Sequence, residues 1–117
     1  MDRAVKAARE AFENGPWAAM HPTQRGQFLR RLGDLIARDA DRLALAEVCD
    51  NGKLWAEMRG QCGYIPQWFH YFGGLADKIE GAVLPIDKPD MFTYTCHEPV
   101  GVVAAITPWN SPLLLLT

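Results

Sequence analysis

The apolar residues in the first half of the chain recur at intervals of three and four positions, which predicts amphipathic helices. The first helix spans residues 2–14 and ends at Gly15 and Pro16, a pair typical of helix termini. The second covers about residues 21–38, and Pro22 favours its start. In both segments most charged residues fall on the face opposite the apolar stripe, as expected of helices that cover a core.

Two further helices are predicted in the middle of the chain. One begins after Asp39 or Asp41, either of which can cap it, and ends at the turn of residues 50–52. Gly52 in that turn suits a positive φ. The other helix spans residues 54–78 and carries many aromatic residues, namely Trp55, Tyr64, Trp68, Phe69, Tyr71 and Phe72.

Pro66 lies inside the pattern of this aromatic helix. Proline removes one backbone hydrogen bond, and its ring clashes with the carbonyl four residues earlier, which belongs to Cys62. We therefore expect a kink or a break near Gly63.

The pattern changes in the last quarter of the chain. Residues 92–97 alternate between apolar and polar positions, which predicts a strand with one covered face. Residues 100–106 contain no polar residue and predict a strand buried on both faces, as in a parallel sheet covered by helices. Pro108 ends this strand, and Ser111 followed by Pro112 favours a new helix. The predicted fold class is therefore α/β, although a self-sufficient α/β domain needs more strands.

Composition narrows the class of protein. With 49% hydrophobic residues, 22% charged residues and a net charge of −2, the chain is typical of globular proteins. It has no basic excess, so nucleic acid is not an expected partner, and no apolar stretch long enough for a membrane span. We find no secretory signal pattern, and three widely spaced cysteines indicate free thiols in a reducing compartment. The expected location is cytoplasmic.

The three cysteines, Cys49, Cys62 and Cys96, are interpreted as small buried apolar residues. Cys96 and His97 point to opposite faces of the predicted strand, so they cannot form a nucleophile and base pair. The cysteines and histidines show no metal-ligand spacing, and no glycine-rich phosphate loop is present.

Asn110 is the candidate for chemistry, because its amide can donate to an oxyanion without titrating. The alternative is an asparagine that bonds the backbone of its own turn.

Three segments of the sequence resemble the NAD(P)-dependent aldehyde dehydrogenases. They are EPVGVVAAITPWNSPL at residues 98–113, DNGK at 50–53, and the segment from WF to GGLADK at 68–78. The resemblance covers nearly the whole chain, but only the first quarter of such an enzyme. It implies that residues 1–117 are a partial N-terminal cofactor-binding domain. In such a domain the helices precede an extended strand and the first buried strand of a Rossmann-like sheet, and the catalytic domain is absent.

The resemblance also implies an activity. The enzyme would oxidise an aldehyde to a carboxylic acid with NAD or NADP, through a cysteine thiohemiacetal and a thioester. Asn110 would stabilise the oxyanion, and the cofactor would be bound by Ile106, Thr107, Pro108, Trp109 and Asn110, chiefly through backbone groups. Ile106 and Trp109 have core packing as their alternative role. Since the nucleophilic cysteine and the general-base glutamate belong to other segments, residues 1–117 alone are expected to be inactive. They are also expected to fold poorly, because one or two strands with several helices cannot cover the apolar strand at residues 100–106.

The resembled enzymes are oligomers, so a homodimer or homotetramer is expected, with residues 92–97 as an oligomerisation or domain-bridging strand. A different class of function stays open: the chain could be a non-catalytic helical interaction module. In that case the aromatic residues between Trp55 and Phe72 would form the partner-binding face. Their alternative role is to pack onto a sheet.

Overall fold

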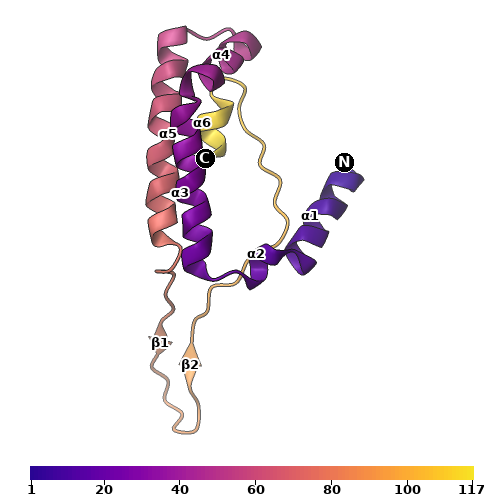
Figure 1. Cartoon of the computed structure of the whole chain (residues 1–117). Coiled ribbons are helices and arrows are strands. Elements are labelled where there is room, and N and C mark those ends of the chain that lie inside the picture. The colour runs from indigo at the N-terminus through magenta and orange to yellow at the C-terminus, as the bar shows by residue number, and fades with distance from the viewer.

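A computed structural model describes residues 1–117 as a mostly helical chain with one small sheet (Figure 1). The elements are α1 (Asp2–Asn14), α2 (Pro16–Ala19), α3 (Pro22–Arg38), α4 (Ala40–Asn51), α5 (Trp55–Leu75), β1 (Val83–Leu84), β2 (Thr93–Tyr94) and α6 (Pro112–Leu116). All the predicted helices form, and Gly52 ends α4 with a φ of 74°. No helix combines the length and the apolar character that crossing a membrane requires.

Helices α3 and α5 lie side by side, and glycines allow their backbones to approach closely (Figure 1). A Cβ atom at Gly26 would collide with the carbonyl oxygen of Gly73, and one at Gly33 would lie 2.8 Å from the ring of His70. Arg30 Nη1 donates to the carbonyl oxygen of Gly73 at 2.7 Å. The packing of α3 on α5 therefore depends on residues without side chains at the contact.

The buried core is small and lies between α4 and α5. It consists of Ala40, Ala44, Met58 and Cys62, with the half-buried Leu113 of α6 packed against it. Only 12 of the 117 residues are buried, so most large apolar side chains of the chain remain in contact with solvent. Such a large exposed apolar surface is typical of a surface that another part of a protein covers.

Helix α5 runs without interruption through Pro66, so a break near Gly63 is wrong, and a kink there stays a prediction. Pro66 is buried, and its carbonyl oxygen lies close to Gly33 of α3. Proline costs the helix one backbone hydrogen bond, but tertiary packing can hold a helix together across that gap.

The predicted strand at residues 92–97 is reduced to Thr93–Tyr94, which pairs with Val83–Leu84 as an antiparallel hairpin. In Figure 1 this hairpin projects away from the packed helices. The rings of Phe92 and Tyr94 lie 5.7 Å apart, consistent with the predicted shared face. A two-stranded hairpin is only marginally stable by itself. Because no further strand pairs with β1 or β2, only two residues on each side keep strand pairing.

Residues 100–106 form no strand, and the prediction that they are buried is wrong for this chain. Val100 and Ile106 are each 94% exposed. A strand needs a neighbour to pair its backbone groups, and β1 and β2 pair only with each other. The chain therefore contains helices and one two-stranded sheet, and its residues build no Rossmann-like sheet.

Candidate functional site

The candidate loop, residues 107–111, joins the extended segment 100–106 to α6. Ser111 is 5% exposed, and its hydroxyl donates to the carbonyl oxygen of Asn110 at 2.7 Å. The predicted helix does begin at Pro112, but the Ser111 side chain does not cap it. Because its hydroxyl bonds backward along the chain, Ser111 stabilises the loop instead of the helix end.

A long-range hydrogen bond joins this segment to α4. The backbone N–H of Leu113 donates to Glu47 Oε1 at 2.8 Å. This N–H lies in the first turn of α6, where backbone donors have no partner within the helix and a carboxylate is electrostatically favoured. Glu47 is only 8% exposed, and its other oxygen, Oε2, is buried without a hydrogen-bond partner.

The residues predicted to bind cofactor form one contiguous and mostly exposed stretch. Ile106 is 94% and Trp109 is 73% exposed, so their alternative role as core residues is not seen in this chain. Thr107 is half-buried, and Pro108 and Asn110 are exposed. The chain's hydrogen bonds include none to the side-chain amide of Asn110, whereas a structural turn asparagine would bond the backbone.

The cysteines differ in their surroundings. Cys62 is fully buried, as predicted, but Cys49 and Cys96 are exposed, so the prediction is wrong for these two. Burial raises the pKa of the Cys62 thiol, and the negative charge of Glu47 raises it further. No group of three or more His, Cys, Asp or Glu side chains is placed to hold a metal ion.

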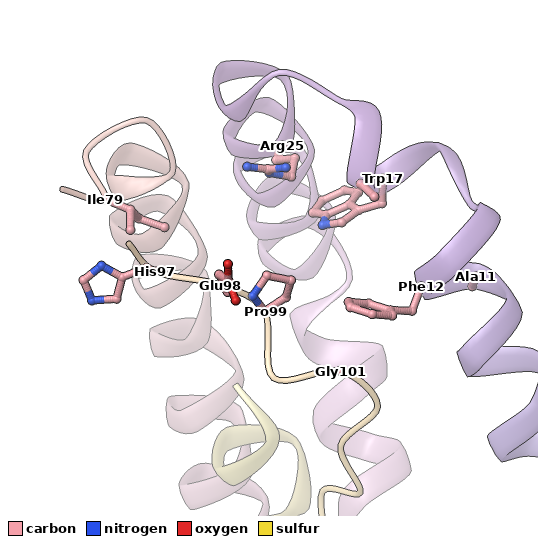
Figure 2. A pocket seen from close by; sticks show the side chains of 10 residues that line it. Ala11, Phe12, Trp17, Arg25, Ile79, His97, Glu98, Pro99 and Gly101 are labelled. Carbon is pink, nitrogen blue, oxygen red and sulfur yellow. The ribbon is translucent and has the colours of Figure 1, made fainter. Parts of the chain in front are cut away.

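A cavity of about 570 Å³, which no residue pattern predicted, lies between the α1–α2 corner and the segment before Val102 (Figure 2). Figure 2 shows Phe12 and Trp17 on one side and Glu98 and Pro99 on the other. None of the predicted site residues lines this cavity. Such a space depends on how segments far apart in the sequence lie together, which residue patterns do not reveal.

Comparison with known proteins gives a consistent result. The aldehyde dehydrogenase family model matches residues 1–117. The chain is 49% identical over 115 residues to (Z)-2-((N-methylformamido)methylene)-5-hydroxybutyrolactone dehydrogenase of Acinetobacter baylyi, covering 98% of this chain and 24% of that protein. It is also 49% identical over 117 residues to the mitochondrial aldehyde dehydrogenase of Equus caballus, covering 98% of this chain and 23% of that protein.

Solved structures are similar over the same length. The NAD-dependent aldehyde dehydrogenase of Sinorhizobium meliloti matches with a TM-score of 0.90 and 37% identity, covering 98% of this chain and 23% of that one. A betaine aldehyde dehydrogenase of Staphylococcus aureus in complex with NAD+ matches with a TM-score of 0.89 and 42% identity, again over 98% and 23%. The chain thus spans about a quarter of the length of the relatives it matches.

Proposed function

This chain belongs to the aldehyde dehydrogenase family, and we propose that it forms part of the cofactor-binding domain of an enzyme that oxidises aldehydes to carboxylic acids with NAD or NADP. The identities of 49% to two dehydrogenases support this proposal, as do the solved structures, whose names include NAD. The helical chain would contribute the N-terminal part of that domain, and the catalytic domain would lie outside residues 1–117.

The backbone of the extended segment supports a role in a larger sheet. Within the chain, the backbone groups of residues 100–109 make no hydrogen bond. Backbone groups left unpaired along an apolar segment need partners once that segment is buried. We infer that residues 100–106 become the first strand of a Rossmann-like sheet in the complete domain, and that the exposed Ile106, Pro108 and Trp109 and the half-buried Thr107 then contact the cofactor.

Asn110 has the chemistry that aldehyde oxidation needs. In the proposed reaction, a cysteine thiolate from outside residues 1–117 attacks the aldehyde carbon, and the carbonyl oxygen becomes an oxyanion. The Asn110 amide would donate a hydrogen bond to this oxygen. Nicotinamide, when bound, would supply the acceptor for the hydride that leaves the same carbon, and water would then release the carboxylic acid from the thioester.

The hairpin and the cysteines indicate how the complete enzyme would assemble and where it would be found. The exposed hairpin would lie in the interface of a homodimer or homotetramer, because a free two-stranded edge favours pairing with another chain. The expected location stays the cytoplasm, a reducing compartment in which three free cysteines would persist.

The exposed aromatic face of α5 is the observation that favours the alternative, a helical interaction module. Trp68 stacks with Phe72, and Tyr71 meets Phe72 edge to face, all on the solvent side. The same side chains would cover one face of the Rossmann-like sheet in the complete enzyme. We favour the enzyme, since the family match extends along the whole chain.

The observation that carries the proposal is the exposed amide of Asn110, which makes no hydrogen bond within the chain, in a loop that Leu113 attaches to the core. The test is to express the complete enzyme and to measure formation of reduced nicotinamide with NAD or NADP and a panel of aldehydes. Residues 1–117 alone serve as the comparison, and we expect no activity from them. Absence of aldehyde oxidation by the complete enzyme would overturn the proposal.

A further inference from the structure

We propose that Glu47 is a positioning residue that fixes the Asn110 loop through the backbone of Leu113. This inference rests on the proposed oxyanion role of Asn110. Glu47 does not contact the reacting atoms in this proposal. It acts by holding the segment from which the Asn110 amide extends.

The hydrogen bond between Glu47 and Leu113 is the only one that joins residues 98–117 to the rest of the chain. Its acceptor comes from the middle of α4, a helix packed firmly on α5. Its donor side is also secured, because Leu113 packs against the core cluster. Glu47 thus connects a rigid helix pair to a segment that is otherwise extended and exposed.

Few bonds separate this anchor from Asn110. Only Ser111 and Pro112 lie between Asn110 and Leu113, and the proline ring restricts one backbone angle of this link. Ser111 is buried, and its hydroxyl bonds the carbonyl oxygen of Asn110. A displacement of the Leu113 amide would therefore also displace Asn110.

A carboxylate is a costly choice for this position if stability alone were its purpose. Glu47 Oε2 is buried with no partner, and a buried polar group without a hydrogen bond destabilises the folded state. An apolar side chain of similar volume would avoid that cost. A hydrogen-bond acceptor gives what an apolar side chain lacks, namely a directional contact that selects one position of the α6 backbone.

The test uses the complete enzyme and three variants. Glu47→Met keeps the length of the side chain but accepts no hydrogen bond from the Leu113 N–H. Glu47→Gln retains an acceptor oxygen. Asp50→Ala, which removes an exposed carboxylate from the same helix, is the control. For each protein we would measure hydrogen–deuterium exchange in residues 108–117, together with kcat and the KM for the cofactor.

We expect Glu47→Met to accelerate exchange in residues 108–117 and to lower kcat at least tenfold, since a misplacement of about 1 Å can cost about 10²-fold in rate. The KM for the cofactor should change less than threefold. Glu47→Gln should restore kcat to within threefold of the parent enzyme, and Asp50→Ala should change neither readout. A structural role alone would lower the amount of folded enzyme without this division between kcat and KM.

Three results would overturn the inference: unchanged exchange in Glu47→Met, normal kcat despite faster exchange, or a Gln variant as impaired as the Met variant. If Glu47→Met does not fold, the inference is tested by Glu47→Gln alone. A loss of kcat in that variant would then overturn the inference. An inactive parent enzyme would instead mark a failure of the proposed function. Exchange in residues 108–117 would still report whether Glu47 holds the loop, so the two failures are distinguishable.

Discussion

Glu47 Oε1 and the backbone nitrogen of Leu113 are 66 positions apart in the sequence and 2.8 Å apart in space. The bond attaches the last helix to α4 and leaves the loop before it exposed. Since Asn110 lies in that loop, one buried carboxylate connects the helical core to the residue with the candidate chemistry.

Replacement of Asn110 by alanine should impair catalysis much more than cofactor binding. The amide would act on charge that develops only in the transition state, so the loss should appear in kcat. Loss of one such donor costs about 10²–10³ in kcat in other enzymes. Steady-state kinetics and cofactor titration of the complete enzyme measure both quantities. Asn14→Ala, at an exposed position of α1, is the control, and near-normal kcat in Asn110→Ala would exclude the assigned role.

Gly26→Ala should destabilise the protein by about 1–3 kcal/mol, because overpacking of a close contact costs about this much. The added Cβ atom would collide with the carbonyl oxygen of Gly73 and push α3 away from α5. Gly60→Ala is the matched control: it lies in α5 with no heavy atom within 4 Å of the added Cβ. That change should stabilise the helix by roughly 0.5–1 kcal/mol. Denaturant unfolding measures both, and equal effects would contradict the glycine packing.

Cys62 should react with a thiol-alkylating reagent more slowly than Cys49 or Cys96 in the native protein. It is fully buried, whereas the other two are exposed. Burial and the charge of Glu47 raise the pKa of Cys62, so a smaller fraction of it is thiolate near pH 8. Its labelling should increase only at higher pH. Site-resolved mass spectrometry over a pH series gives the three rates, and equal rates at pH 8 would show that the α4–α5 core is open.

Tyr94→Lys should weaken assembly of the complete enzyme. We expect a dimer or tetramer for the parent enzyme, and an ammonium group placed in an interface is costly to bury without a partner. Analytical ultracentrifugation at micromolar concentration measures the change. Asn14→Lys places the same charge at an exposed polar position of α1 and should leave the oligomer intact. A parent enzyme that sediments as a monomer would contradict the interface.

The local signals of the sequence predicted the helices well. Pro22 at the start of α3, Gly52 after α4 and Pro112 at the start of α6 all act within a few residues of their own position. A helix forms its hydrogen bonds within one segment, so periodicity and terminal residues are enough to locate it. The family could also be identified from the sequence, because its motifs are short and contiguous.

Residues 100–106 and Pro66 show where local signals fail. An apolar run predicts a strand, but a strand forms only where another strand is available to pair with it, and these residues have none in this chain. Pro66 predicts a break, but packing against α3 keeps α5 whole. The burial of Cys62 and the exposure of Cys49 also depend on which helix faces which.

The sequence by itself therefore determined every helix except the short α2, the family and the identity of Asn110 as the candidate residue. Only the tertiary structure decided that Glu47 meets Leu113 and that Asn110 is left free. The physical reason is distance along the chain. A helix end depends on neighbouring residues, but a hydrogen bond across 66 positions exists only after α4, α5 and α6 have packed together.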